Sequence, residues 1–460
     1  MKNKERINTI RNVAVPDFFN LTVQEGMSVT LEGGLIKKVE KDAGGPLSAG
    51  GAGGTAETAE TAQTAGTAVI DGKGMLLIPG MVNLHAHTAM TLLRGTAEDC
   101  NAVDWFNKYI WIYEQGLTSD DVYTGTLLGG AEMLLNGVTS VADHYFAMDR
   151  AFDAFETLGM RADLSWAVFG MGDDAEEKLE EALAFSRGYR DRNPLIGVSL
   201  GPHSPYLCPD LFLEKMAGIA ADEGFKLHLH VAEDYRQMEI SQKERGKTPM
   251  EILRDTGVLQ PGGLGAILAH AYYATDGDME IMAENNCYAA HCPKTYLRFG
   301  DSHDFLPRAL KSGAGIALGS DGPASNSTMN IAEAARLAAL MGKGASGRAE
   351  AAPVGEVLPL MFSGGKALGL PNYGSIVPGA PADLVLLDLN TPEMIPGNNL
   401  FADILYGLDG RNIHTVIVDG SSVVKDGKLL TVDFKSLRDE ARAIARRLLS
   451  TEADAPMQTY

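Results

Sequence analysis

The chain has 460 residues, 45% hydrophobic and 22% charged, which is typical of a globular protein with room for a large and a small domain. Its formal net charge of −21 argues against nucleic acid or an anionic membrane as a partner, because both attract positive charge. Four cysteines without a CxxC pair argue against a disulfide scaffold. With a polar N-terminus and no long apolar stretch, we expect a cytoplasmic protein.

The N-terminal region has the pattern of short strands and turns. Residues 27–40 predict a hairpin, with apolar positions on both sides of a Gly33-Gly34 turn. Residues 44–68 are rich in Gly, Ala, Thr and Glu and poor in large apolar side chains, which predicts a flexible insertion, with a docking segment as the alternative. Strand patterns resume at residues 68–72.

From residue 76 to about 325, apolar strands alternate with longer amphipathic stretches. The predicted strands are 76–84, 138–145, 161–169, 196–203, 225–232, 265–272, 287–291 and 314–321. The predicted helices between them include 120–136, 175–187, 209–223, 276–285 and 304–312. Eight such units predict an α/β fold, a (β/α)8 TIM barrel. A doubly wound sheet is the alternative, but the chain lacks its Gly-rich phosphate fingerprint.

The C-terminal region returns to strand patterns in residues 381–430 and ends in an amphipathic helix at 433–449. We expect these strands to pack on the N-terminal ones, which makes one small β-sandwich domain from both chain ends. The predicted division is a small domain of 1–75 and 373–432, a barrel of 76–372, and a C-terminal helix and tail of 433–460.

Six of the eight predicted barrel strands end in histidine or aspartate, although the chain has only ten histidines. Active sites of such barrels lie at the carboxyl ends of the strands, so this concentration predicts a site there. The residues concerned are His85, His87, His203, His230, His270, His291 and Asp321.

The spacing of His85 and His87 places both side chains on one face of a strand, where they can hold one divalent metal ion. An ordinary pair of strand histidines is the alternative. Together with His230, Asp321 would complete a set of three histidines and one aspartate. Such a set leaves room for a water molecule, as in an open catalytic site.

His230 shares a strand face with His228, so either could be the third histidine. We choose His230, because it lies nearer the strand end and Glu233 follows it by three residues. His228 would then lie one layer deeper, as a hydrogen-bonded core residue. His144 ends the second predicted strand, and we expect it to be structural.

Five segments then carry a resemblance to a known family. They are PGMVNLHAHTAMTLLRG (79–95), HVAE (230–233), LAHA (268–271), HCP (291–293) and GSDGPASN (319–326). They resemble the metal-dependent amidohydrolase superfamily, and most of all its aminohydrolase branch, which includes 5′-methylthioadenosine/S-adenosylhomocysteine deaminases. The resemblance implies one divalent ion, zinc first with iron or manganese as alternatives, on His85, His87, His230 and Asp321. It also implies a homo-oligomer, dimer or tetramer.

The implied activity is hydrolytic deamination of an adenine nucleoside. Asp321 would be both ligand and base and would accept a proton from the attacking water, which the metal ion activates. His270 would orient that water and stabilise the developing charge. Glu233 would protonate a ring nitrogen and then the leaving amine, the role that a non-ligand glutamate has in zinc deaminases of another fold.

Four residues are candidates for substrate binding. By resemblance, Glu114 would hold the ribose hydroxyls and His203 would contact the purine or the ribose. Trp105 and Met90 would form an apolar wall, although core packing is an equal alternative for each. The small-molecule substrate is therefore expected to be a nucleoside.

Two departures from the family pattern concern the substrate's tail. Trp166 stands where an arginine is common in members that accept S-adenosylhomocysteine, and Thr295-Tyr296 stands where Ser-Asn is usual. Both favour adenosine, 5′-deoxyadenosine or 5′-methylthioadenosine over a substrate with a carboxylate. The alternatives are a deaminase or hydrolase of another heterocycle (guanine, pterin or s-triazine), or a non-catalytic scaffold.

Overall fold

The larger part of the molecule is a closed barrel of eight parallel strands. The computed structural model describes residues 5–44, 61–64, 67–260 and 262–450. The barrel strands are β7 (Met81–Ala86), β8 (Val138–Tyr145), β9 (Arg161–Val168), β10 (Ile196–Pro202), β11 (Leu227–Val231), β12 (Ala266–His270), β13 (Cys287–His291) and β14 (Gly315–Leu318). They pair in chain order, and a parallel bridge between Ala86 and Asp321 joins the two ends. The predicted (β/α)8 barrel is confirmed.

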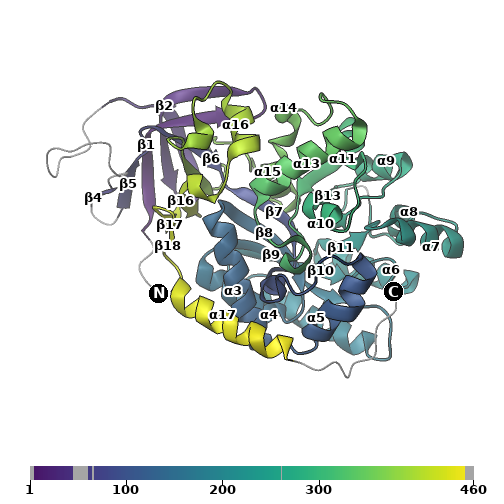
Figure 1. Cartoon of the computed structure of the whole chain (residues 1–460). Helices are drawn as coiled ribbons and strands as arrows, with labels where there is room; N and C mark the ends of the chain where they lie inside the picture. Colours follow the sequence, from purple (N-terminus) through teal and green to yellow (C-terminus); the bar gives the residue numbers. More distant parts are fainter. Residues whose placement is uncertain (1–4, 45–60, 65–66, 261, 451–460) are drawn as a thin grey trace.

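Helices follow the barrel strands and surround them (Figure 1), as the periodicity predicts. They are α1 (Ala102–Trp105), α2 (Trp111–Glu114), α3 (Ser119–Leu135), α4 (Met148–Leu158), α5 (Ala175–Tyr189), α6 (Asp210–Glu223), α7 (Tyr235–Arg245), α8 (Pro249–Asp255), α9 (Asp276–Glu284), α10 (Pro293–Arg298), α11 (Phe305–Ser312), α12 (Pro323–Asn326), α13 (Ile331–Ser346), α14 (Val354–Val357) and α15 (Leu360–Ala367). Short 3₁₀ or π turns are η1 (Thr88–Leu93), η2 (Phe106–Ile110), η3 (Pro392–Met394) and η4 (Gly410–Asn412).

Local sequence explains why several of these helices begin where they do. Thr118, Thr248 and Thr275 each form a capping box that satisfies the first free backbone N–H groups of α3, α8 and α9. The barrel strands are nearly continuously buried, because one face packs on helices and the other fills the barrel, where several of the buried side chains are polar. Among the described helices, none is both long and apolar enough to cross a membrane.

The two chain ends build a second, antiparallel-rich sheet beside the barrel. Its strands are β1 (Ile7–Asp17), β2 (Thr22–Glu32), β3 (Leu35–Lys41), β4 (Thr61–Thr64), β5 (Thr67–Asp71), β6 (Met75–Pro79), β15 (Leu384–Asp388), β16 (Ile413–Val418), β17 (Ser421–Lys425) and β18 (Lys428–Leu429). Figure 1 shows the purple N-terminal strands beside the yellow-green C-terminal ones, and pairing of β15 with β6 joins the two groups. The expected small domain from both ends is confirmed, as is the 27–40 hairpin.

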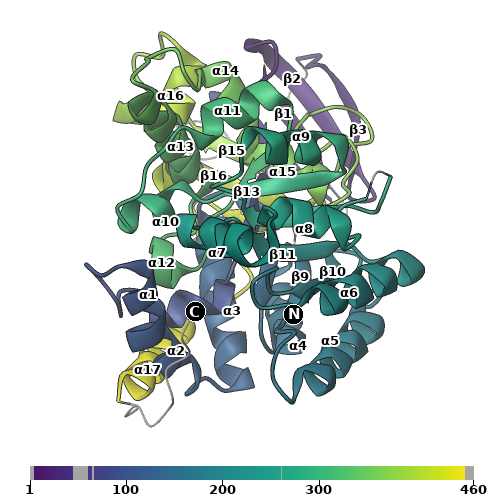
Figure 2. The same cartoon turned by 90° about the vertical axis from the view of Figure 1, so that its right-hand side faces the viewer.

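The C-terminal helix α17 (Phe434–Leu449) leaves the small domain and packs on α3 and η1 of the barrel (Figure 2). The other helix of this region is α16 (Leu400–Gly407). Leu437, Ala441 and Leu448 are the buried residues of α17, spaced as one face of an amphipathic helix requires. The predicted terminal helix is confirmed.

Two predictions about strands need correction. The expected first barrel strand, 76–84, is two strands in two sheets, because the chain passes from β6 to β7 at Gly80. A Cβ atom at Gly80 would overlap the hydroxyl oxygen of Thr139, so only glycine fits at this crossing. Within the expected insertion 44–68, residues 61–64 form β4, paired with β5; the β-branched threonines at its two ends favour a strand. Residues 45–60 and 65–66 lie outside the described residues.

Candidate active site

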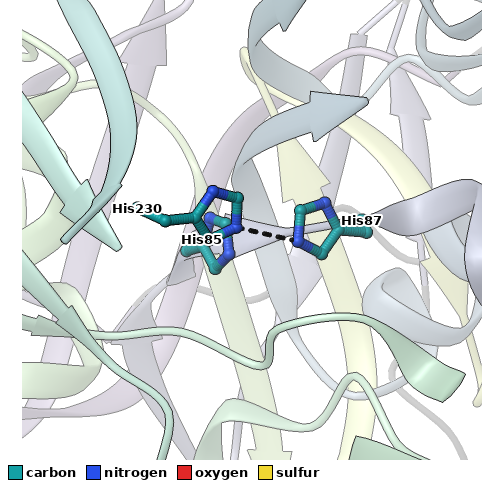
Figure 3. A group of neighbouring side chains, drawn as sticks. All are labelled: His85, His87 and His230. Atoms are coloured by element: carbon teal, nitrogen blue, oxygen red, sulfur yellow. Dashed lines mark hydrogen bonds between the residues drawn. The ribbon is translucent and has the colours of Figure 1, made fainter. Parts of the chain in front are cut away.

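Five of the predicted residues lie together at the carboxyl ends of the barrel strands. Ligand-type atoms of His85, His87 and His230 lie within 4.8 Å of one another, and so do those of His85, His270 and Asp321. Figure 3 shows the first three rings converging, with the Nε2 atoms of His87 and His230 3.2 Å apart. The Oδ1 atom of Asp321 lies 3.4 Å from Nε2 of His87 and 3.7 Å from Nε2 of His85.

Backbone carbonyls set the tautomers of two of these histidines. The Nδ1 atom of His87 donates to the carbonyl of His144 at 2.5 Å, and Nδ1 of His230 donates to the carbonyl of His203 at 3.1 Å. A neutral imidazole with its proton on Nδ1 has a lone pair on Nε2. Both Nε2 lone pairs therefore point at the shared centre. His144 acts here through its backbone, which agrees with the structural role we expected.

A chain of hydrogen bonds sets the tautomer of His85 in the same way. The Ser165 hydroxyl donates to the carbonyl of Asp143 at 3.2 Å, so its oxygen accepts from Nδ1 of His228, also at 3.2 Å. Nε2 of His228 then accepts from Nδ1 of His85 at 2.9 Å. The Nε2 atom of His85 is buried and has no hydrogen-bond partner among the described residues. His228 is thus the hydrogen-bonded core residue that we predicted.

These donors fit a divalent cation. Burial lowers the pKa of His85 to about 3 and also lowers the pKa values of His87 and His230, so all three rings are neutral at physiological pH. Burial alone would raise the pKa of Asp321, but the neighbouring histidines hold it below its usual range, as a carboxylate. Three neutral imidazole nitrogens and one carboxylate are ligands that zinc prefers. Without a bound cation, the buried Nε2 atom of His85 would have no hydrogen-bond partner among the described residues.

The second oxygen of Asp321 is occupied, which orients the first. Oδ2 accepts from the hydroxyl of Ser325 at 2.6 Å and from that of Thr295 at 3.0 Å. Asp321 itself has φ of +59°, a strained conformation of the kind found at functional sites. Two hydroxyls and the backbone therefore point Oδ1 at the histidine cluster.

Glu233 and His270 face each other beside the cluster, with Oε1 of Glu233 3.6 Å from Nε2 of His270. The hydroxyl of Tyr206 donates to Oε2 of Glu233 at 3.3 Å, and burial raises the pKa of this carboxyl. On its other side, Nδ1 of His270 lies 3.2 Å from the hydroxyl of Tyr296. A raised pKa favours the protonated form of a carboxyl, which suits a group that gives and takes a proton.

Two predicted substrate residues lie around this centre. The hydroxyl of Tyr145 donates to Glu114 at 2.5 Å, and burial raises the pKa of Glu114 to about 7. The ring of His203 is stacked between Phe169 and His230, with ring centroids 4.7 and 4.6 Å apart. Burial lowers the pKa of His203 to about 3, so it offers a neutral ring.

The two apolar candidates lie against the segment that follows β14, which includes the short helix α12. Nε1 of Trp105 donates to the carbonyl of Ala324 at 3.3 Å, and its ring packs against Phe299. Met90 is buried and packs closely on Gly322. A Cβ atom at position 322 would lie only 2.5 Å from the sulfur of Met90. Gly322 follows Asp321 directly, so both side chains support the loop that carries the carboxylate.

The interpretation of Trp166 is wrong. Its ring packs against Phe185 of α5, whereas the preceding residue, Ser165, hydrogen-bonds to His228 inside the barrel. Successive side chains of a strand point to opposite faces, so Trp166 points to the helix layer. It therefore carries no information on the tail of a substrate.

Sequence reasoning missed several residues that hold the predicted ones. Ser325 lies inside the GSDGPASN motif, and Thr295 and Tyr296 entered only as departures from a family pattern. Tyr145 and Tyr206 gave no signal, because a single tyrosine near a strand end is ordinary. All five lie at a strand end or in the segment that follows it, so a search for hydroxyl residues over these segments would have included them.

Comparisons with known proteins agree with this site. The family model described as "Amidohydrolase family" matches residues 76–423. A 5-methylthioadenosine/S-adenosylhomocysteine deaminase from Pelotomaculum thermopropionicum is 37% identical over 385 residues, 83% of this chain and 88% of that protein. A 5′-deoxyadenosine deaminase from Methanosarcina mazei is 35% identical over 387 residues, with 83% and 88% covered.

Among solved structures, the chain resembles an adenosine deaminase from Xanthomonas campestris with bound zinc. The TM-score is 0.87 at 26% sequence identity, and the match covers 97% of this chain and 100% of that one. The family model covers well over half of the residues, and the fold agrees along nearly the whole length. The chain belongs to the amidohydrolase family.

Proposed function

We propose that the protein is a metal-dependent hydrolase that deaminates an adenine nucleoside and releases ammonia. One observation carries the proposal: four metal-type donors meet beside the Glu233–His270 pair, so a cation site and a proton-transfer pair share one centre. The printed activities of the relatives, which are deaminases of 5-methylthioadenosine, S-adenosylhomocysteine and 5′-deoxyadenosine, support this substrate class.

His85, His87, His230 and Asp321 would hold the metal ion, for which we propose zinc. When bound, a divalent cation supplies Lewis acidity that makes water a nucleophile near neutral pH. His270 is close enough to join this set, but its surroundings differ. Its Nδ1 lies against a tyrosine hydroxyl and its Nε2 faces Glu233, so we give it a role toward the substrate.

The protein's own side chains then move the protons. Asp321 accepts a proton from the water that attacks the amine-bearing carbon, since its Oδ1 faces the cluster. Glu233, whose protonated form burial favours, gives a proton to the adjacent ring nitrogen. Glu233 then takes up the proton that Asp321 accepted and passes it to the departing amine, which leaves as ammonia. The remaining hydroxyl proton returns to Glu233 as the carbonyl group of the product forms. His270 stabilises charge beside Glu233 during both transfers.

Recognition of the nucleoside would rest on Glu114 and His203. The carboxylate of Glu114, held by Tyr145, would accept hydrogen bonds from the ribose hydroxyls. His203 would contact the purine with its neutral ring. We propose that Trp105 and Met90 act by supporting the loop after β14, which keeps the pocket wall in place.

A substrate panel with metal analysis tests this function. We expect stoichiometric transition metal and ammonia release from adenosine, 5′-deoxyadenosine or 5′-methylthioadenosine. Release only from guanine, pterin or s-triazine substrates would reject the nucleoside and keep the hydrolase. Absence of both metal and ammonia release after loading with zinc, manganese or iron would favour a non-catalytic scaffold.

We also propose a reducing, cytoplasmic setting and a homo-oligomer. The four cysteines are free, and three of them are buried, which fits a compartment that does not form disulfides. Light scattering on the purified protein would test the oligomer: a mass near 49.0 kDa would contradict it.

A further inference from the structure

The helix α10 lies directly behind the site and contacts it with two successive side chains. Thr295 donates to Asp321, and the hydroxyl of Tyr296 lies against His270. Tyr296 is only 4% exposed, so its hydroxyl must find its partners within the protein. The partners of this hydroxyl decide what it does to His270.

The Tyr296 hydroxyl has a defined hydrogen-bonding direction. Its oxygen accepts the backbone N–H of Cys292 at 3.2 Å, which leaves the hydroxyl proton to be donated. Nδ1 of His270, also at 3.2 Å, is the acceptor that the structure places there. A ring that accepts at Nδ1 carries its proton on Nε2 when neutral. The N–H of His270 therefore points toward Oε1 of Glu233, 3.6 Å away.

This tautomer is the opposite of the one in the three ligand histidines. Nδ1 of His87 and of His230 donates outward to a carbonyl, which leaves a lone pair pointing inward. Nδ1 of His270 accepts, which points an N–H inward instead. A donor at this place suits the developing negative charge and the Glu233 carboxyl, whereas a lone pair would suit a cation.

The ring of Tyr296 is rigidly held. It is stacked on Tyr272 with centroids 3.7 Å apart and planes inclined by 8°, and Tyr272 is stacked in turn on His303 at 3.7 Å. His270 has φ of +72°, a strained backbone that needs support from its surroundings. A fixed hydroxyl on a fixed ring gives this support to the imidazole.

We propose that Tyr296 is a positioning residue: its hydroxyl holds His270 with Nδ1 as acceptor, so that the Nε2–H group faces Glu233 and the reacting amine. This inference rests on the proposed deaminase function. It assigns a chemical role to the tyrosine that stands at a position where the sequence departs from the family pattern.

Tyr296→Phe in the zinc-loaded enzyme tests the role, because it removes the hydroxyl and keeps the stacked ring. We expect kcat to fall by about 10- to 100-fold, with KM and zinc content unchanged, as for other residues that orient a site histidine. The control is Tyr373→Phe, which removes a buried hydroxyl bonded to Thr139 at 2.7 Å and Ser140 at 3.2 Å near the start of β8. That variant should lose stability but keep kcat.

A second readout does not depend on any substrate. In protein labelled with ¹⁵N-histidine, with the His270 signals assigned by comparison with His270→Gln, we expect the proton on Nε2 in wild type and a loss of this preference in Tyr296→Phe. A proton on Nδ1 of His270 in wild type would overturn the proposal. So would an unchanged kcat, or a fall in kcat that only follows zinc content or folded fraction. A wild type with the Nε2–H tautomer that releases no ammonia would instead reject the proposed function.

Discussion

The carboxyl ends of the barrel strands and the segment that covers them (residues 88–118) hold their functional side chains in different ways. At the strand ends, His85 and His230 are buried on strands whose backbone and neighbours determine each ring. The covering segment consists of short 3₁₀, π and α turns. Two of its candidate substrate side chains are held by residues outside it: Trp105 by Ala324 and Phe299, and Glu114 by Tyr145.

We propose that this difference separates the chemistry from most of the recognition; His203, at the end of β10, is the exception. A strand end cannot shift without breaking barrel pairing, so it suits groups that must be placed to within a fraction of an ångström. A segment of short turns can change with little cost to the barrel, so it suits contacts to the variable part of a substrate. We therefore expect changes at the strand ends to remove metal or turnover, and changes in the covering segment to alter KM.

The largest effect is expected from His87→Ala. Its Nε2 lies 3.2 Å from that of His230, so the variant should lose the metal and with it all measurable activity. Metal analysis after gel filtration checks this. His414→Ala is the matched control, since His414 lies on β16 of the small domain and contacts Asp426. Stoichiometric metal in His87→Ala would overturn the proposed ligand set.

Glu233→Gln should keep the metal and lose turnover. The amide has nearly the same shape but cannot pass a proton, so kcat should fall by about 10²–10⁴-fold. The measurements are ammonia release and metal content on the same sample. Glu239→Gln, at an exposed position of α7, should behave as wild type. Activity within about threefold of wild type would exclude proton transfer by Glu233.

Glu114→Gln should act on KM and on its pH dependence. Because the pKa of Glu114 is about 7, its carboxylate form becomes dominant as pH rises through 7, and a carboxylate accepts hydroxyl protons more strongly than a carboxylic acid. For wild type, KM for a nucleoside should therefore fall as pH rises across this range. The variant should lose this dependence and show a KM about tenfold higher above pH 7.

Free adenine is the control for Glu114, because it lacks the ribose. If the protein turns it over, KM for adenine should be the same in wild type and in Glu114→Gln at each pH. A pH-dependent KM that persists in the variant would assign the titration to another group and remove Glu114 from ribose binding.

The smallest effect is expected from Arg447→Ala, at the end of α17. Arg447 donates to the carbonyl of Gly116 at 2.8 Å and pairs with Asp121, and thus ties the covering segment to the C-terminal helix. Since the side chain is about half exposed, the loss should raise the nucleoside KM only about two- to threefold, with kcat unchanged. Arg446→Ala, at the exposed neighbouring position, should have no effect. An equal change in the nucleoside KM in both variants would show that the effect does not depend on the contacts of Arg447 with Gly116 and Asp121.

The strand periodicity and the strand-end residues are enough to predict the barrel and most of its centre. Alternation in a strand is strict, so spacing alone places His85 with His87, and His228 with His230, on one face. The choice of His230 over His228 came from its place nearer the strand end. The same rule, applied to Trp166 with Ser165, would have placed that tryptophan outside the barrel. The error came from interpreting one position by resemblance rather than by its face.

The Pro79-Gly80 pair is a local break signal in the first strand, but the sheet that each half joins could not be predicted from the local pattern. Residues 76–84 are apolar nearly throughout, and the sequence carries no mark of which sheet each half joins. The choice depends on Val385 and its neighbours in β15, which lie some three hundred positions later and pair with β6. β6 and β15 can pair only after the N-terminal and C-terminal regions of the chain have come together.

By itself, then, the order of the residues determined which secondary structures form and which polar groups lie at the strand ends, because both follow from local periods and caps. The tertiary structure decided how each group is held: the His228–Ser165 chain behind His85, the two hydroxyls on Asp321, and Tyr296 behind His270. Apart from the bond between Ser325 and Asp321, which lie in one motif, these contacts join residues from different βα units. Their direction depends on which donors remain free in the packed barrel, and no single segment contains that information.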